Sequence, residues 1–221
     1  MAQDPTSLHE ELSPFGFEAF TDTASRLVLG DSQPLIQNRI CAIQTLGAEN
    51  ALRLGLDFLK ETTNLEEIYL PNVAPKSLID FIPEGITVQF LPYFDEKTNL
   101  FDEKSFISKL KNLPRKSCIV LETGGKWNLS GAYPTDWSTI IEIISKREIF
   151  PIFGSTQQGF IDVDLGPFDK IVEKDVEFMI CHDFTHTLGL YSQPIGLLSL
   201  VTKVSFRLYS KARSGLSTVT S

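Results

Sequence analysis

Two apolar runs joined by a polar loop mark the part of the chain from Glu177 to Val201, EFMICHDFTHTLGLYSQPIGLLSLV. Residues 176–181 are apolar except for Glu177, and residues 195–201 are apolar except for Ser199. Short apolar runs bounded by polar turns are typical of strands buried inside a sheet. Open α/β sheets hold their ligands where strands end, so the loop between these runs is the first place to look for a site.

The rest of the chain alternates strand-like and helix-like segments. Apolar runs predict strands at residues 40–46, 67–70, 87–91, 117–121 and 149–153, in addition to 176–181 and 195–202. Apolar residues at helical spacing predict helices over 15–29, 51–62, 76–82, 102–112 and 136–146, with Pro14 at the first turn of the first helix. Strands that alternate with helices indicate a mostly parallel sheet with helices on both faces.

The composition predicts one domain with a substantial core, because the 221 residues are 42% hydrophobic and 22% charged. A net charge of -8, from 20 basic and 28 acidic residues, argues against a nucleic acid or an anionic membrane as the partner. The three cysteines, Cys41, Cys118 and Cys181, lie in apolar runs without C-x-x-C spacing, which suits a reducing compartment. With no leader pattern and no apolar run of ~18 residues, we expect a cytoplasmic protein without a membrane span.

The segment HDFTHTLGLYSQPIGLLSLV resembles the part of the aspartate aminotransferases, a family of class I pyridoxal-phosphate-dependent aminotransferases, that carries the cofactor lysine. The family pattern is S-F-S-K-N-F-G-L-Y, then an arginine, then V-G-N-L. The residues that survive from this pattern are Phe184, Gly189, Leu190, Tyr191 and Gly196. His186 stands at the position of the Schiff-base lysine, and Pro194 stands at the position of the arginine.

Further motifs of the family follow in the same order between about Leu8 and Lys203. Ala51-Leu52-Arg53 comes after a bend that the family writes S-G-T-G and this chain writes Gly47-Ala48-Glu49-Asn50. ETGGKWNLSGAYPTDW is similar to H-A-C-A-H-N-P-T-G with one residue inserted. This alignment puts Asn128 and Gly131 on the family's asparagine and glycine.

Two more stretches carry the resemblance together with substitutions. REIFPIFGSTQQGF is similar to F-P-F-F-D-x-A-Y-Q-G-F, so Gln158-Gly159-Phe160 match, while Gly154 takes the aspartate position and Gln157 the tyrosine position. Glu11 replaces a tyrosine that in the family reaches the neighbouring subunit's cofactor. The family tryptophan that stacks on the cofactor ring falls at or near Pro75.

The resemblance implies the large domain of a fold-type-I pyridoxal-phosphate-dependent transferase. This fold is a three-layer α/β/α arrangement around a mostly parallel seven-stranded sheet whose last strand is antiparallel. Residues 1–203 would form a partial large, cofactor-binding domain. Residues 204–221, which are basic and rich in Ser and Thr, would form a divergent, flexible tail. Compared with whole aminotransferases, we expect a truncated chain that lacks the small domain.

The substituted positions are those on which pyridoxal-phosphate chemistry depends. The imidazole of His186 cannot form a stable aldimine, and Gly154 offers no carboxylate for the ring nitrogen. Glu49, Asp183 and Pro194 leave the phosphate facing carboxylates without an arginine. Each carboxylate ~4 Å from a phosphate charge costs about 4 kcal/mol at an effective dielectric of ~20. We therefore predict that pyridoxal phosphate binds weakly or not at all, and that no residue is catalytic.

The expected function is that of an aspartate aminotransferase-like protein that is catalytically inactive. Its old dimer face would allow a homodimer, or a heterodimer with a full-length relative. The alternative is a residual pyridoxal-phosphate-dependent aspartate:2-oxoglutarate aminotransferase in amino-acid metabolism, which the preserved order of strands and Asn128 favour. A third hypothesis, a truncated product that never folds stably, follows from the late start and the change of character after Lys203.

Several local patterns have two interpretations. Residues 182–186, H-D-x-x-H, fit a metal site or, better, a hydrogen-bonded surface loop, and we expect no metal. Gly124-Gly125-Lys126 hints at a phosphate loop but lacks the outer glycine and the following Ser or Thr of that motif. Lys126 as a displaced Schiff-base lysine is disfavoured because it belongs to a different strand end. Asn128 is either a remnant of the cofactor site or, preferably, a turn residue that bonds its own backbone.

Overall fold

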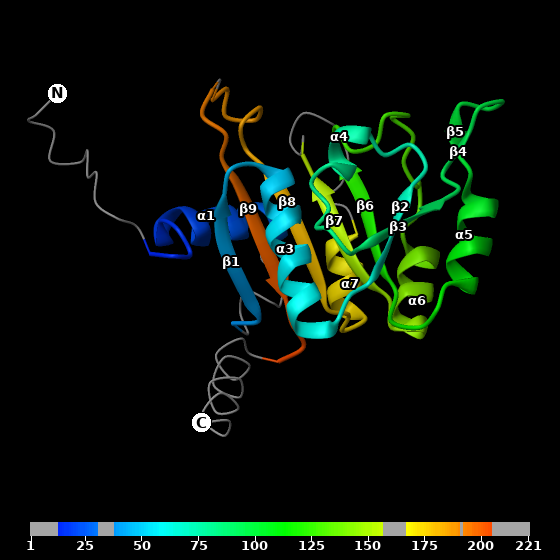
Figure 1. The fold of residues 1–221 in the computed structure, drawn as a ribbon, viewed down its shortest axis with the longest axis horizontal. Helices are drawn as coiled ribbons and strands as arrows, with labels where there is room; N and C mark the ends of the chain where they lie inside the picture. The colour runs from blue at the N-terminus through cyan, green and yellow to red at the C-terminus, as the bar shows by residue number, and fades with distance from the viewer. Residues whose placement is uncertain (1–12, 31–37, 157–166, 191, 205–221) are drawn as a thin grey trace, which may run out of the picture.

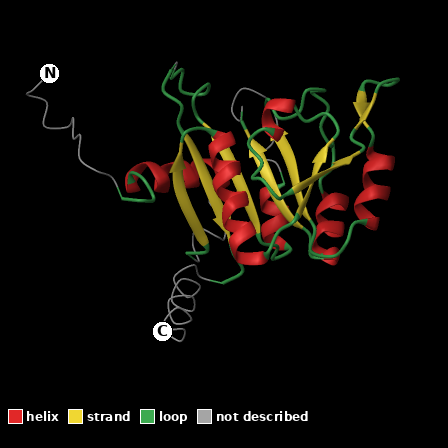
Figure 2. Cartoon of the chain, viewed as in Figure 1, coloured by secondary structure: helices red, strands yellow, loops and turns green. Residues whose placement is uncertain are grey.

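The computed structural model describes residues 13–30, 38–156, 167–190 and 192–204, and it is built around a seven-stranded sheet (Figures 1 and 2). The strands of this sheet are β1 (Ile40–Thr45), β2 (Glu67–Pro71), β3 (Thr87–Leu91), β6 (Cys118–Gly124), β7 (Phe150–Ser155), β8 (Phe178–Asp183) and β9 (Gly196–Val201). All seven predicted strands are therefore confirmed. A small pair, β4 (Phe94–Asp95) and β5 (Leu100–Phe101), was not predicted because each strand is too short to show a pattern.

The order of strands in the sheet is β1-β9-β8-β7-β6-β2-β3. Neighbours from β8 through β3 pair in parallel, whereas β9 pairs antiparallel with both β1 and β8. The expected antiparallel last strand is thus confirmed. Because β9 turns back beside β8, Asp183 at the end of β8 lies opposite Gly196 at the start of β9.

Six helices are described: α1 (Glu18–Leu29), α3 (Ala48–Thr63), α4 (Lys76–Ile79), α5 (Glu103–Asn112), α6 (Ser138–Arg147) and α7 (Phe168–Glu173). The five predicted helices are present, and the six-residue α7 was missed. The first helix begins at Glu18, so the prediction that Pro14 lies in its first turn was wrong. The reason is that the preceding residues pair with β1: the backbone N–H of Gln44 donates to the carbonyl of Phe15, and the Gln44 side chain accepts from the N–H of Phe17.

Two apolar cores lie on the two faces of the sheet and define three layers. One core holds the inner faces of α3 and α4, and the other holds those of α1, α5, α6 and α7. In Figure 1, α3 crosses in front of the sheet. Strand β8 contributes side chains to both cores, because Phe178 and Ile180 point to one face of the sheet while Met179 and Cys181 point to the other. Burying each large apolar side chain of this kind stabilises the fold by about 1.5–3 kcal/mol. Because helices cover both faces of the sheet, the α/β/α prediction is confirmed.

Several predictions fall on residues outside the described ranges. They concern Glu11, Gln157, the match at Gln158-Gly159-Phe160, Tyr191 and, beyond Val204, the tail. The three cysteines are described, and all of them are free thiols. Within the part of the chain that the structure covers, no helix combines the length and apolar character that a membrane crossing requires.

Gly196 lets the start of β9 approach the bend before α3. A Cβ atom built on Gly196 would lie 2.6 Å from the backbone carbon of Gly47, 2.7 Å from its Cα and 2.7 Å from the carbonyl oxygen of His182. All three neighbours are backbone atoms, so they cannot rotate away. The close approach holds the bend at Gly47 beside the strand end that carries Asp183.

We predict that Gly196→Ala lowers the free energy of unfolding by about 3 kcal/mol, because the added methyl group displaces backbone. Gly55→Ala is the matched control. Its Cβ would meet the flexible Sδ of Met179 at 2.9 Å, and it lies inside α3, where alanine is favoured by about 1 kcal/mol. Urea unfolding of both variants measures the difference, and equal losses would contradict the role given to Gly196.

Candidate functional site

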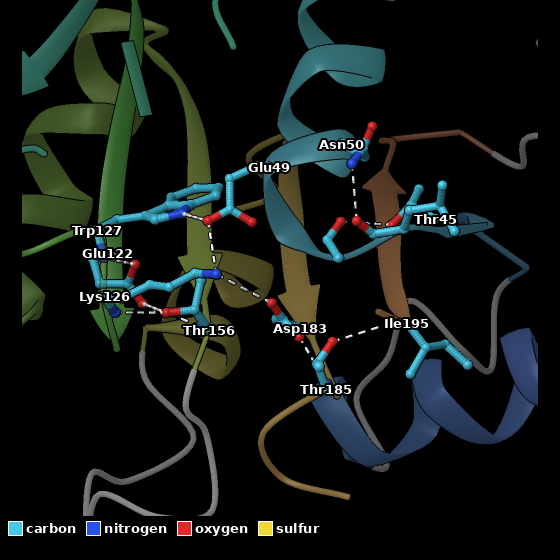
Figure 3. Close-up of polar contacts among 12 residues, drawn as sticks. Thr45, Glu49, Asn50, Glu122, Lys126, Trp127, Thr156, Asp183, Thr185 and Ile195 are labelled. Atoms are coloured by element: carbon cyan, nitrogen blue, oxygen red, sulfur yellow. Dashed lines mark hydrogen bonds and ion pairs between the residues drawn. The ribbon is translucent and has the colours of Figure 1, made fainter. Parts of the chain in front are cut away.

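The carboxyl ends of β6, β7 and β8 meet the start of α3 at one edge of the sheet, where a group of polar side chains converges. We call Glu49, Glu122, Lys126, Trp127, Thr156 and Asp183 the edge cluster (Figure 3). Its members come from the first turn of α3, from β6 and the loop after it, from the end of β7 and from the end of β8. Parallel strands bring these distant parts of the chain together because their carboxyl ends share one edge.

Lys126 lies between two carboxylates of the edge cluster. Its Nζ is 2.8 Å from Oε1 of Glu49 and 3.4 Å from Oδ2 of Asp183. The Asp183 side chain is 5% exposed, so this ion pair is partly buried. Burial lowers the pKa of Lys126, but the hydrogen bonds and charges of Glu49 and Asp183 outweigh it, and the pKa lies above its usual value.

The position of Lys126 corrects one inference from the sequence. The residue was set aside because it belongs to a different strand end, yet its ammonium group contacts Asp183 at the end of β8. The two strand ends are separated in sequence and adjacent in space. Lys126 is therefore a member of the candidate site.

Glu122 is a buried carboxyl group surrounded by donors. Its Oε1 accepts from the backbone N–H of Gly124 and of Thr156, both at 3.3 Å, and its Oε2 accepts from the N–H of Trp127 at 3.2 Å. Burial raises its pKa to about 7, although these hydrogen bonds lower it. One signal in the sequence was overlooked, which is a single acidic residue at the end of an otherwise apolar strand.

The loop after β6 uses its own backbone donors internally. The N–H of Gly125 donates to the hydroxyl of Tyr133 at 2.9 Å, and the N–H of Lys126 donates to Oγ1 of Thr156 at 2.7 Å. With Gly124 bonded to Glu122, every N–H of Gly124-Gly125-Lys126 has a side-chain acceptor. A phosphate loop needs these groups free, so this arrangement does not form one.

Trp127 fills the space above Gly154. Its side chain is buried, and its Nε1 donates to Oε1 of Glu49 at 3.3 Å. A Cβ atom built on Gly154 would lie 2.2 Å from Cε3 of Trp127 and 2.8 Å from Oε2 of Glu122. The aspartate position of the resemblance is therefore covered by an indole ring. A carboxylate does reach this position, but it comes from Glu122 on the neighbouring strand, which the sequence analysis missed.

The start of α3 keeps the form of a phosphate-binding bend without the hydroxyl side chains of the family motif. Gly47 caps the helix with φ of 87° and offers no side chain, and Glu49 lies in the first turn. The side chains of Thr45 and Asn50 bond the carbonyls of Gly47 and Leu46, at 3.0 and 2.9 Å. Glu49, predicted to face a phosphate, contacts Lys126 and Trp127.

Residues 182–186 form a hydrogen-bonded loop. Oδ1 of Asp183 accepts from the N–H of Thr185 at 2.8 Å, and Oγ1 of Thr185 accepts from the N–H of Ile195 at 3.1 Å. His182 is buried against Phe184, with ring centroids 4.2 Å apart, and burial lowers its pKa to about 4. His186 is exposed in the turn that follows β8. Across the described ranges, no group of three or more His, Cys, Asp and Glu side chains is placed to hold a metal ion.

Asn128 makes the hydrogen bonds of a turn residue. Its Oδ1 accepts from the N–H of Ser130 at 3.1 Å and from Oγ of Ser130 at 2.6 Å, and its Nδ2 donates to the carbonyl of Ala132 at 2.6 Å. The amide side chain is buried and both of its ends are engaged within its own loop. These contacts fit the preferred of the two interpretations, in which Asn128 shapes the loop.

Comparisons with known proteins return aminotransferases. The chain is 30% identical over 210 residues to the cytoplasmic aspartate aminotransferase of Caenorhabditis elegans, covering 91% of this chain and 51% of that protein. Among solved structures, the aromatic amino acid aminotransferase of Burkholderia cenocepacia matches with a TM-score of 0.84 and 25% identity, over 92% of this chain and 52% of that chain.

A second structure, the aromatic-amino-acid aminotransferase of Burkholderia pseudomallei covalently bound to pyridoxal phosphate, matches with a TM-score of 0.82 and 23% identity, over 96% of this chain and 54% of that chain. No family model matches the chain. The chain spans about half the length of the curated relatives it matches, and the likeness in fold extends over nearly all of it.

We predict that Lys126→Met lowers the free energy of unfolding by about 1–3 kcal/mol, because the buried carboxylate of Asp183 loses its cation. Lys146→Met is the matched control. Lys146 pairs with Glu142 on an exposed helix face, where such a pair contributes at most about 0.5 kcal/mol. Urea unfolding at neutral pH measures both losses, and a Lys126 variant as stable as the control would contradict the pairing.

Glu122 and His182 give the free energy of unfolding opposite pH dependences. The folded state raises the pKa of Glu122 from 4.5 to about 7, so its contribution is full below 4.5 and is lost as pH rises to about 7. The folded state lowers the pKa of His182 from 6.5 to about 4, so its contribution is full above 6.5 and is lost as pH falls to about 4. The two trends offset each other between these limits.

We therefore expect the Glu122→Gln variant to show the pH dependence of the free energy of unfolding that His182 causes, without the opposing effect of Glu122. Between pH 4.5 and 6.5, the free energy of unfolding of this variant should rise by about 2 kcal/mol more than that of the natural chain. His182→Gln should show the reverse. Urea unfolding at a series of pH values measures both curves, and parallel curves for all three proteins would contradict the prediction.

Proposed function

The chain is a homologue of the aspartate aminotransferases, spanning about half of their length, and we propose that it is a catalytically inactive member that does not use pyridoxal phosphate. The observation that carries the proposal is the closed edge cluster, in which Trp127 covers Gly154 and Lys126 is shared by Glu49 and Asp183. When pyridoxal phosphate is bound in an enzyme, it supplies an imine and an electron sink. Both need groups that this site has replaced.

The first requirement is a free primary amine. His186 has none, and its imidazole cannot exchange an imine with a substrate. Lys126 has an amine at the edge of the sheet that carries the site. Two carboxylates hold this amine in the ammonium form and raise the pKa of Lys126. An ammonium group carries no lone pair for attack on an aldehyde. Lys126 thus supports the ion pairs of the cluster and does not replace the missing lysine.

The second requirement is a place for the ring and the phosphate. The ring position over β7 is taken by Trp127, which a side chain at Gly154 would strike. The phosphate position faces Glu49 and Asp183, whose two negative charges exceed the single charge of Lys126. The backbone donors of the loop after β6 are engaged as well. The residues present do not fit the cofactor, and we derive no reaction through it.

The alternative, a residual aspartate:2-oxoglutarate aminotransferase, depended on the order of strands and on Asn128. The order of strands belongs to the fold and is compatible with either function. Both ends of the Asn128 amide bond Ser130 and Ala132, so the loop already accounts for this residue. We infer that the preserved motifs maintain the scaffold.

We further propose that the protein acts in the cytoplasm, as a homodimer or as a heterodimer with a full-length relative. The proposed cytoplasmic location is supported by the name of the relative from Caenorhabditis elegans, a cytoplasmic aspartate aminotransferase. The preserved large-domain fold supports pairing through the same face as a complete enzyme. Residues 1–203 would be the partial large domain in such a pair, with residues 204–221 as its tail.

The purified full chain, titrated with pyridoxal phosphate, should develop no visible absorbance band of an internal aldimine. It should also leave aspartate and 2-oxoglutarate unconverted when the cofactor is added, because two carboxylates hold Lys126, the lysine that the described residues place at this site, as an ammonium group. Absorbance before and after borohydride, together with a coupled transaminase assay, measures both outcomes. A band that borohydride abolishes, or turnover of both substrates, would overturn the proposed function.

A further inference from the structure

We propose that the indole of Trp127 is an internal plug, which occupies the slot on β7 that a planar ring would enter and is locked there by Glu49 and Lys126. This inference rests on the proposed loss of the cofactor and goes beyond it. It assigns the exclusion to one side chain of the chain itself, in addition to the missing lysine. The slot would then be filled in every copy of the folded protein.

The first support is steric. A Cβ atom on Gly154 would lie 2.2 Å from Cε3 and 2.7 Å from Cζ3 of Trp127, both in the six-membered ring of the indole. Contacts below about 3 Å do not occur between real carbon atoms. The ring therefore lies in the volume of the first side-chain atom at position 154. An aspartate at 154 and a tryptophan in this rotamer at 127 therefore exclude each other.

The second support is that the indole is packed as core. Trp127 is 2% exposed and belongs to the apolar cluster under α3, together with Val120, Ile152 and Cys181. A ring in such surroundings contacts atoms on both faces and cannot swing aside without opening a cavity. Trp127 is thus a fixed part of the fold and does not act as a mobile lid.

The third support is the lock on both ends of the residue. The backbone N–H of Trp127 donates to Glu122, and its Nε1 donates to Glu49 (Figure 3). Glu49 in turn is held by Lys126 at 2.8 Å. A buried indole N–H needs an acceptor, and Glu49 supplies it from another element of the fold. The charged pair and the ring therefore hold each other in place.

A double-mutant cycle between Gly154→Ala and Trp127→Ala tests the plug. In the natural background, Gly154→Ala should lower the thermal midpoint by roughly 10 °C, because the new methyl group meets the indole. In the Trp127→Ala background the same change should cost less than about half as much, because the two nearest of the three closest atoms belong to the indole and are then gone. Equal costs in the two backgrounds would overturn the inference.

Two additions keep the cycle decisive. Trp127→Leu, which retains an apolar side chain in the core, replaces the alanine background if that variant does not fold. Gly55→Ala is the matched control, because its Cβ would meet Met179 and not the plug. Gly55→Ala should lower the thermal midpoint by the same amount in the natural background and in the background that lacks Trp127. A control that depends on Trp127 as strongly as Gly154→Ala does would also overturn the inference.

Fluorescence gives a second, independent measurement. The chain has two tryptophans, so Trp137→Phe leaves Trp127 as the reporter. Its emission should be that of a buried indole, weakly quenched by acrylamide, and should not change on addition of pyridoxal phosphate. Quenching like that of an exposed indole would show that the ring does not occupy the slot.

His186→Lys separates failure of the plug from failure of the proposed function. The plug predicts that this variant, which regains a lysine, still forms no aldimine band with pyridoxal phosphate, whereas the band would appear if the slot were open. A band in His186→Lys alone would overturn the plug and leave the proposed function standing. A band in the natural chain would overturn the proposed function, and the double-mutant cycle would then judge the plug separately.

Discussion

The ammonium group of Lys126, shared between Glu49 and Asp183, is the interaction on which the arrangement of the site depends. It joins the first turn of α3, the loop after β6 and the end of β8. Without it, a carboxylate that is 5% exposed would face a second carboxylate at the same sheet edge. Unpaired buried charges cost several kcal/mol, so these ion pairs stabilise the carboxylates at this edge of the sheet.

A second feature of the site is the carboxyl group that β6 supplies beside the neighbouring parallel strand β7. Gly154 on β7 has no side chain, and Glu122 on β6 sends its carboxylate to within 2.8 Å of the Cβ that Gly154 lacks. A carboxyl group near this point is thus retained, but its oxygens are turned inward onto backbone N–H groups. A carboxyl group that is buried and bonded in this way serves the fold, since the ring of Trp127 lies beside it over Gly154.

The sequence predicted the fold well because its signals are local. Apolar runs marked all seven strands, and the family motifs supplied their order and the antiparallel β9. The site was predicted in part: the losses at His186 and Gly154 are visible residue by residue. The positions of Lys126, Glu122 and Trp127 were not, because strand ends meet through the topology of the sheet and not through spacing along the chain. The short helix α7 and the β4-β5 pair were not predicted, because elements of this length show no clear sequence pattern.

Charge and steric occupation can be weighed against each other as causes of exclusion. Repulsion from Glu49 and Asp183 is weaker than the sequence suggests, because Lys126 neutralises part of it. Moving a buried tryptophan out of a core costs about 3–5 kcal/mol. A micromolar ligand is bound by about 8 kcal/mol, so displacement of Trp127 alone would weaken its binding by about two to four powers of ten. Occupation of the slot, as proposed, would therefore weaken the binding of a ring on its own, and the remaining charge would add to this effect.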